Sequence, residues 1–469
     1  MSRTARARQE TQEEIARFLS IGPVQVAELD LGAEAGGLRP GPGSPPVTSG
    51  AVFVLVRRDG RPVGTLLGQV PEGADPAEVL AGPAGAMLEG APHEAVRGAA
   101  CEAHGEPVPG ADDGTLGDAG RVANGEADDA KSGQVARGAP PASVVVATRE
   151  RAGQLARALD SLLAQDHPDF EIVVVDNAPV TRETRELVER KYGERVRYVC
   201  EPHPGLAVAH NRGLAAVRRE VVAFTDDDVV ADPRWLTELT SPFAADPRLG
   251  CATGLILPAR LGTPAQVLLE SHGGFAKGFT PRTYDPRRPP ADEPLFPFTA
   301  GRFGSGANMA FRTNALRAVG GFDPATGAGT RARGGDDLYG FVRVLAQGHR
   351  LRYTPSALVW HHHRETWRDL ETQAYGYGAG LTAYLTAILV NRPALLPAFL
   401  ARVPGGLAHA RGLTAVREAQ GGGAPGSHDE RTHPWPRRLS RLQRRGMVYG
   451  PVGYLRARYA LRTALRGPG

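Results

Sequence analysis

Three consecutive carboxylates, Asp226, Asp227 and Asp228, follow the largely apolar run at residues 221–225. Because side chains alternate between the two faces of a strand, Asp226 and Asp228 are predicted to project together while Asp227 points away. Two carboxylates about 4 Å apart repel by roughly 1 kcal/mol in water and about 4 kcal/mol at an effective dielectric of 20, so the pair favours a bound cation. Oxygen ligands suit a hard divalent ion, Mg²⁺ or Mn²⁺, that also carries substrate phosphates. The pattern predicts a metal site, with a solvated acidic loop as the alternative.

A second acidic pair, Asp336 and Asp337, follows two glycines and precedes an apolar helical stretch that includes Phe341. Acids at the start of a helix can simply cap it and complement its dipole. The functional interpretation is that Asp337 removes the proton of an acceptor hydroxyl as a general base. Spacing alone favours neither interpretation.

Three histidines, His361 to His363, follow a strand-like run at residues 351–360. Strand alternation places His361 and His363 on one face. Histidines at a strand end are more often structural than ligands, but imidazole can complete the shell of Mn²⁺. The acidic cluster elsewhere in the chain favours the ligand role.

The strands and helices that must position these groups alternate after residue 141. Strand-like runs lie at 143–147, 171–175, 196–200 and 221–224, and helical spacing occurs at 154–164 and 205–217. This order predicts an α/β fold with a doubly wound, mostly parallel sheet, in which ligands gather at the carboxyl ends of the strands. Those ends carry Thr148 with Arg149, Asp176 with Asn177, and the three aspartates, so three strands are predicted to deliver polar groups to one edge.

A dinucleotide site at this edge would need a glycine-rich turn that lets the backbone approach the pyrophosphate. Residues 148–153 contain one glycine in place of three, and a G-x-x-x-x-G-K-[ST] loop is absent. A diphosphate would therefore be held by metal and side chains.

Length and composition set wider limits. The 469 residues, 41% of them hydrophobic, allow two or three domains and a sizeable core, and a formal charge of +4 does not indicate a nucleic-acid partner. Three cysteines in no metal-ligand spacing suit a reducing compartment, and the first 19 residues lack a secretory apolar core. These features predict a cytoplasmic location, with the inner face of the plasma membrane as a variant.

Four regions are predicted. Residues 1–106 form a small α+β domain with a hairpin turn at 58–62, and residues 107–140, rich in Gly, Ala, Asp and Pro, form a disordered linker. Residues 141–365 form the catalytic domain, and residues 366–469 are helical and basic. No acid occurs after residue 431, and arginines there interleave with apolar residues, which favours peripheral contact with an anionic membrane over a solvated face or a nucleic-acid patch. The uncharged stretch at 372–391 is predicted to be a packed or interfacial helix rather than a transmembrane one.

From residue 141 to about 364 the chain resembles the inverting family 2 glycosyltransferases of the GT-A fold. The matching segments, in order, are VVVATRER (144–151), VVVDN (173–177), AHNRG (209–213), FTDDD (224–228), GANMAFR (306–312), GDD (335–337) and VWH (359–361). Asp336 stands where the family more often has glutamate, and His210 where arginine is frequent.

The resemblance implies a role for each matching polar residue. Those expected to contact the nucleotide sugar are Thr148, Arg149, Asp176, Arg212, Asp226 and Asp227. The D-x-D residues Asp226 and Asp228, with His361, are similar to the family's metal ligands, Asp337 is similar to its catalytic base, and Asp336 is expected at the acceptor.

The implied function is metal-dependent, inverting transfer of a sugar from a nucleotide-diphosphate sugar to a hydroxyl acceptor, using Mn²⁺ or Mg²⁺. Envelope glycans, lipid-linked molecules and secondary metabolites are the acceptor classes considered. Two alternatives stand beside it: a sugar-nucleotide pyrophosphorylase, which needs a Gly-rich loop that is missing, and a non-catalytic GT-A-like scaffold, which would be expected to lack an essential acid.

Overall fold

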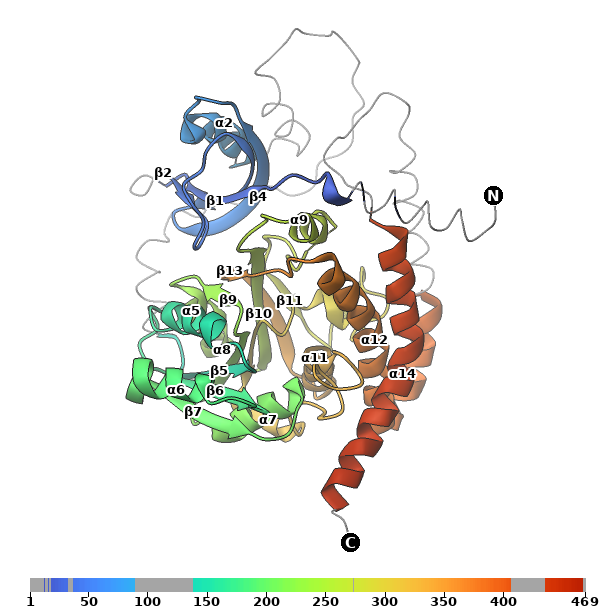
Figure 1. Ribbon diagram of the computed structural model, residues 1–469. Coiled ribbons are helices and arrows are strands. Elements are labelled where there is room, and N and C mark those ends of the chain that lie inside the picture. The colour runs from blue at the N-terminus through green and yellow to red at the C-terminus, as the bar shows by residue number, and fades with distance from the viewer. Residues whose placement is uncertain are drawn as a thin grey trace, which may run out of the picture. The chain divides into compact units, whose positions relative to one another are not determined.

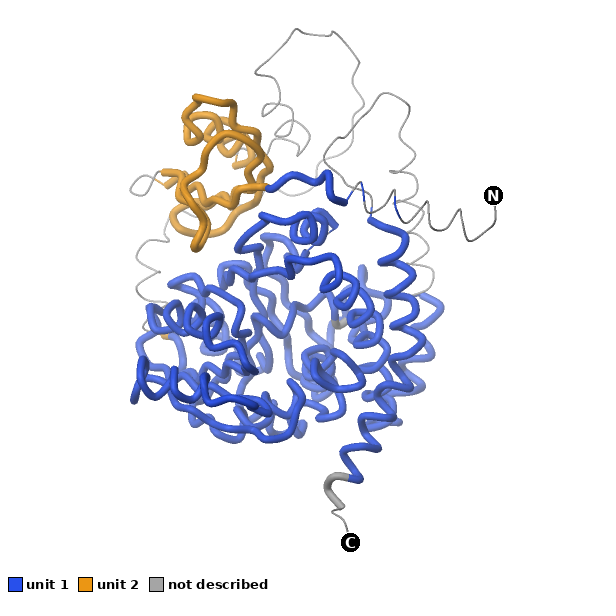
Figure 2. Tube along the Cα trace, viewed as in Figure 1, with its two compact units in different colours: residues 1–23, 139–469 blue, residues 24–138 orange. Residues whose placement is uncertain are grey.

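The computed structural model describes residues 12, 16, 18–32, 37–88, 138–272, 274–405 and 435–466. The chain divides into two compact units, Val24–Gly138 and Met1–Pro23 with Ala139–Gly469 (Figure 2). The linker predicted at 107–140 lies, except for its last three residues, outside the described residues. The four-region division therefore stays a prediction.

The smaller unit is a four-stranded sheet covered by one helix. The strands are β1 (Gln25–Asp30), β2 (Gly37–Pro40), β3 (Gly50–Arg58) and β4 (Arg61–Val70), in the order β2-β1-β3-β4, and the helix is α2 (Pro76–Leu88). Strands β3 and β4 form the predicted antiparallel hairpin. Asp59 and Gly60 at its turn have φ values of 51° and 75°, the left-handed conformation that an Asp-Gly hairpin turn requires.

The larger unit is built on a nine-stranded sheet (Figure 1). Its first half consists of β5 (Ala142–Thr148), β6 (Phe170–Asn177), β7 (Val196–Glu201) and β8 (Val221–Asp226), all parallel to their neighbours, as predicted. The second half consists of β9 (Val229–Ala231), β10 (Leu249–Pro258), β11 (Arg282–Tyr284), β12 (Asn308–Arg312) and β13 (Arg350–His361). Because β12 runs antiparallel to both β8 and β10, this half is mixed, and the prediction of a mostly parallel sheet holds only for the first half.

Helices cover both faces of this sheet. The helices of the core are α5 (Ala152–Leu162), α6 (Glu183–Leu187), α7 (Leu206–Ala216), α8 (Trp235–Ala245), α9 (Pro264–Ser271), α10 (Thr313–Ala318) and α11 (Asp336–Ala346). One apolar core joins the sheet to α7, α10 and α11, and a second joins the opposite face to α5 and α8. Alternation along β5 explains this, since Val145 enters the first core while Val144 and Val146 enter the second.

Two long helices, α12 (Trp367–Asn391) and α14 (Arg437–Arg466), lie side by side against the core (Figure 1). Glycines permit their close approach: a Cβ atom on Gly378 would lie 1.9 Å from the Gln443 carbonyl oxygen, and one on Gly446 would lie 2.1 Å from that of Tyr375. Among the described residues, no single helix has the length and apolar content to span a membrane. Helix α12 and residues Pro393–Gly405 reach that length and apolar content only when they are taken together, and the chain bends by 110° between them.

Candidate active site

The carboxyl ends of three adjacent strands bring the predicted polar residues to one edge of the sheet. In the parallel register, Thr148 of β5 pairs with Asp176 of β6, and Ala147 pairs with Asp226 of β8. The register therefore brings together strand ends that are separated by up to 79 residues along the chain.

Asp226, Asp228 and His361 form a group that can hold a metal ion. One ligand atom from each of these side chains lies within 4.8 Å of the others. His361 Nε2 is 3.3 Å from Asp228 Oδ1, and that buried oxygen accepts no hydrogen bond in the described part of the protein. Two carboxylates and one imidazole are donors that Mn²⁺ and Mg²⁺ accept, so the residues fit the divalent ion expected from the sequence.

The charges of this group are strongly coupled. Burial and repulsion from Asp228 raise the pKa of Asp226 to about 7. Burial opposes ionisation of Asp228 as well, but His361 and two arginines hold its pKa well below the usual range. The charges of Asp228 and Asp226 in turn raise the pKa of His361 against the effect of its burial. A divalent cation would relieve the repulsion between the carboxylates.

Asp227 points away from this group, as strand alternation predicts. Its Oδ2 atom accepts a hydrogen bond from Thr148 Oγ1 at 2.6 Å, and its Oδ1 atom lies 3.1 Å from Arg151 Nη1. The same guanidinium nitrogen is 3.4 Å from Asp228 Oδ2. Thr148 and Asp227 are thus engaged with each other, and Arg151 ties two of the three aspartates to the segment after β5.

The second acidic pair begins α11, and the structure distinguishes its two members. Asp336 is buried, with 5% of its surface exposed, whereas Asp337 is partly exposed. Asp337 Oδ2 accepts a hydrogen bond from the Gly306 N–H at 2.9 Å and Oδ1 accepts one from the Leu338 N–H at 2.8 Å. The N-cap residue is Gly335, which has no side chain, so the only first-turn N–H of α11 that the pair is shown to bind is that of Leu338, by Asp337.

The protonation of Asp337 suits a proton acceptor. Desolvation and the neighbouring Asp336 carboxylate raise its pKa to about 6, in opposition to the two backbone N–H groups. A base with a pKa near neutrality combines availability at physiological pH with sufficient basicity.

A short segment before β12 connects Asp337 to the Asp226–Asp228–His361 group. Gly306 donates to Asp337, and the next residue, Ala307, accepts a hydrogen bond from Thr225 Oγ1 at 2.8 Å. Thr225 immediately precedes Asp226 on β8. A Cβ atom on Gly306 would lie 3.4 Å from Asp337 Cβ, an ordinary van der Waals distance, so Gly306 packs directly against Asp337.

His210, on α7, lies between the two acidic groups. Its Nδ1 atom is 3.2 Å from Asp336 Oδ2, and both side chains are buried. In its protonated form His210 favours ionisation of Asp226 and of Asp337 alike. The replacement of the family's frequent arginine thus leaves a basic group in contact with the acidic pair.

The other sequence-predicted nucleotide contacts have different surroundings. Asp176 is fully buried, accepts a hydrogen bond from Tyr198 O–H at 2.9 Å through Oδ2, and has an unpaired buried Oδ1; its desolvation raises its pKa. Arg149 and Arg212 are exposed, and neither forms an ion pair with the acidic cluster in the described part of the chain. Their roles stay predictions.

Sequence reasoning assigned no role to several residues around the metal group. Arg151 and Arg364 approach Asp228, Tyr198 orients Asp176, and Glu270 binds His363 Nε2 at 3.1 Å. His363 Nδ1 lies 3.2 Å from His361 Nδ1, so the chain from Glu270 through His363 orients the metal-ligand candidate. The only local signal was the alternation that placed His361 and His363 on one face.

The family is established by comparison with known proteins. Residues 140–375 match the family model described as "Glycosyltransferase like family 2", and the chain belongs to this family. The matched residues hold the α/β core, in agreement with the α/β glycosyltransferase fold predicted from the sequence, and α14 lies outside them.

Individual relatives include a pre-mycofactocin glycosyltransferase of Mycobacterium tuberculosis, which is 30% identical over 241 residues, or 50% of this chain and 46% of the relative. An O-antigen biosynthesis protein of Myxococcus xanthus is 29% identical over 53% of this chain and 19% of its own length. The chain thus spans about half or less of the length of these two relatives. A solved mannosyltransferase of Pyrobaculum calidifontis, in complex with GDP-mannose and Mn²⁺, is similar at a TM-score of 0.43 and 20% identity over 68% of this chain and 87% of that one.

Proposed function

We propose that the protein is a metal-dependent, inverting glycosyltransferase that moves a sugar from a nucleotide-diphosphate sugar to a hydroxyl acceptor. The observation that carries this proposal is the placement of a metal-binding group and a basic carboxylate on either side of one short segment. The link runs from Asp337 through Gly306 and Ala307 to Thr225, beside Asp226. A donor seated at the strand ends would have its diphosphate at one group and its sugar facing the other.

The reaction is a single displacement. Asp337 takes the proton of the acceptor hydroxyl, whose oxygen forms a bond to the anomeric carbon as the bond from that carbon to the diphosphate breaks. Attack from the face opposite the leaving group inverts the anomeric configuration. Asp226, Asp228 and His361 would hold Mn²⁺ or Mg²⁺, which supplies charge neutralisation for the departing nucleotide diphosphate. Asp336, the buried acid next to Asp337, is itself paired with His210.

The two alternatives are less well supported. A pyrophosphorylase needs a Gly-rich loop after β5, where Arg149, Glu150 and Arg151 stand instead. The Glu150 carboxylate accepts hydrogen bonds from the N–H groups of Val180 and Thr181, so a side chain rather than a glycine backbone makes the contacts at this position. A scaffold would be expected to lack an essential acid, and all of the acids named above are present.

The test is binding and slow hydrolysis of a panel of UDP-, GDP- and dTDP-sugars by the purified protein, first with Mn²⁺ or Mg²⁺ and then with chelator. We expect one nucleotide class to bind, with at least about tenfold weaker binding after chelation, because the carboxylates then repel the diphosphate. Substitution of Asp160, an exposed acid paired with Lys191, by alanine is the matched control and should change nothing. If no donor binds in the presence of metal, a non-catalytic scaffold would explain the protein better than a glycosyltransferase does.

We also propose that α14 docks on an anionic membrane surface, which suits a lipid-linked acceptor. Val448, Val452, Leu455 and Tyr459 are exposed by 79%, 46%, 52% and 71%, and their spacing places them on one face of the helix. Arginines at 441, 444, 445, 456 and 462 flank this stripe, and no acid occurs on the helix. One relative, of Haloferax volcanii, is named a glucosyl-dolichyl phosphate glucuronosyltransferase and is 24% identical over 47% of this chain.

Cosedimentation with vesicles tests the membrane proposal. The wild-type protein should bind phosphatidylglycerol vesicles more tightly than phosphatidylcholine vesicles, and less tightly as salt screens the charges. Val448→Asp with Leu455→Asp should weaken binding about tenfold or more, since both place a charge in the apolar stripe. Val180→Asp, at an apolar side chain of 81% exposure in the catalytic core, is the matched control. Absence of binding at low salt, or equal binding by both variants, contradicts the proposal.

A further inference from the structure

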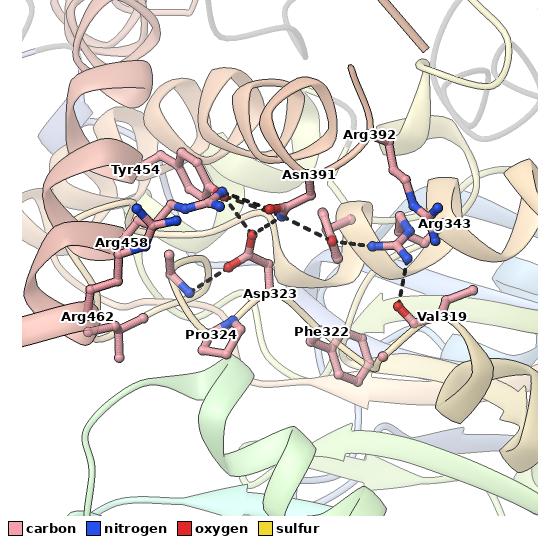
Figure 3. Close-up of a pocket in the computed structure, with 14 residues that line it drawn as sticks. Val319, Phe322, Asp323, Pro324, Arg343, Asn391, Arg392, Tyr454, Arg458 and Arg462 are labelled. Atoms are coloured by element: carbon pink, nitrogen blue, oxygen red, sulfur yellow. Dashed lines mark hydrogen bonds between the residues drawn. The ribbon is translucent and has the colours of Figure 1, made fainter. Parts of the chain in front are cut away.

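A cavity of about 450 Å³ lies away from the acidic cluster, where the loop after α10 meets α11, the end of α12 and the second half of α14 (Figure 3). Its charged lining consists of four arginines and one acid: Arg343, Arg392, Arg458, Arg462 and Asp323. Four guanidinium groups against one carboxylate leave a formal charge of +3 on the lining.

The single acid forms no direct ion pair with these guanidinium groups and reaches Arg458 only through Tyr454 and Asn391. Asp323 Oδ2 accepts hydrogen bonds from Asn391 Nδ2 at 2.6 Å and Tyr454 O–H at 2.8 Å, while Oδ1 accepts one from the Ala325 N–H at 2.9 Å (Figure 3). No carboxylate lies within 4.0 Å of any of the four guanidinium groups in the part of the chain that the structure describes. The carboxylate is therefore committed to fixing α12 and α14 against the loop.

Arg343 carries a buried positive charge with neutral partners only. With 7% of its surface exposed, it donates to the Val319 carbonyl at 2.7 Å and to the Tyr339 hydroxyl, over whose ring its guanidinium lies. A buried charge is costly unless an opposite charge compensates it. Arg392, at the C-terminal end of α12, adds a further positive charge to the lining.

The remaining arginines form the rim. Arg458 Nη1 is fixed by Asn391 Oδ1 at 2.7 Å and by the Tyr454 hydroxyl at 3.0 Å. The side chains of Arg392 and Arg462 are exposed and make no hydrogen bond or ion pair to another described residue. Both guanidinium groups are thus available to a ligand, and they come from two different helices.

We propose that this cavity binds a phosphate ester. Several guanidinium groups approaching one space suit a tetrahedral phosphate, whose oxygens accept paired N–H donors from different directions. The volume exceeds that of a bare phosphate and lies within the range of about 300–1,000 Å³ usual for small-molecule sites, so the phosphate is attached to an organic group. The site is separate from the transfer chemistry, and its existence does not depend on the proposed function.

Isothermal titration of the full-length protein without divalent ions, using inorganic phosphate and glycerol 1-phosphate as probes, tests the site. The wild type should bind glycerol 1-phosphate, and Arg392→Gln with Arg462→Gln should weaken binding at least about tenfold by removing both free forks. Arg287→Gln with Arg288→Gln removes the same charge from exposed positions outside both the cavity and α14 and should leave binding unchanged.

A second measurement locates the ligand. Phenylglyoxal labelling followed by mass spectrometry should show that glycerol 1-phosphate protects Arg392 and Arg462 but not Arg444. Vesicles of phosphatidylglycerol distinguish the source of the phosphate: if only vesicles bind, and the cavity variant loses more binding than the control variant, the ligand is a lipid headgroup. Equal affinities of both variants for the soluble probes and for vesicles, without protection of either arginine, would overturn the proposal.

Discussion

Substitution of Asp337 by asparagine is expected to slow sugar transfer by about 10²- to 10⁴-fold, the usual contribution of a positioned general base. Donor binding should stay within about twofold of wild type, because the substitution leaves the metal group and the strand ends intact. Asparagine keeps the size of the side chain but cannot accept a proton from the acceptor. Single-turnover transfer and donor titration, measured separately, check the two halves of this expectation.

The loss must be distinguished from a folding defect. Asp337 accepts hydrogen bonds from two backbone N–H groups, and the amide of asparagine can satisfy only one of them through its oxygen. We expect this to cost about 1–3 kcal/mol of stability, which thermal unfolding would register. Unperturbed donor binding would show that the variant is folded, and Asp160→Asn is the matched control for removal of one carboxylate. Near-wild-type turnover would remove Asp337 from the mechanism.

The pH dependence supplies an independent signature of the same residue. The pKa of Asp337 is raised to about 6, so the carboxylate is ionised above this pH and protonated below it. With metal and donor saturating, the transfer rate should therefore fall as the pH drops through about 6 and level off above it. The residual rate of the asparagine variant should lack this inflection. An inflection of the same position in both proteins would assign it to another group.

The elements that carry the site were predictable because their signals are local. The alternation of β8 predicted that Asp226 and Asp228 share a face, and the apolar runs of β5, β6 and β7 predicted parallel strands whose ends meet. Periodicity and strand ends depend only on neighbouring residues, so a single sequence contains them.

The connections between these elements were not predictable in the same way. Arg151 reaches Asp227 across 76 residues of chain, and the Gly306 N–H reaches Asp337 across 31. Glycine has no side chain to mark it as a hydrogen-bond donor, and an arginine at a strand end has many possible partners. The antiparallel β12 was not among the predicted strands, yet all five of its residues pair in register with β8. The long-range hydrogen bonds and the pairing of β12 both depend on tertiary contacts, which the propensities of neighbouring residues do not predict.

Removal of Asp228 is expected to abolish metal-dependent donor binding. Asp228 Oδ1 is the buried, unpaired oxygen beside His361 Nε2, so Asp228→Ala leaves Asp226 and His361 without the ligand that joins them. Loss of an outer-shell partner typically lowers metal affinity 10- to 100-fold, so loss of a direct ligand should lower it by about 100-fold or more. Titration of Mn²⁺, followed by donor titration at fixed Mn²⁺, measures both effects.

Stability provides the readout that separates metal binding from catalysis. Mn²⁺ should raise the unfolding temperature of the wild type, because a ligand that binds only the folded state stabilises it by mass action, and should leave that of Asp228→Ala unchanged. Arg151 and Arg364 lose a carboxylate in this variant, so Asp228→Asn, which keeps the shape and one acceptor oxygen, is the companion substitution. Asp160→Ala removes an exposed carboxylate and should retain the full Mn²⁺ response. If Asp228→Ala binds the donor as the wild type does, with and without chelator, the metal does not bind at the Asp226–Asp228–His361 group, and the diphosphate must instead be neutralised by the arginines that surround it.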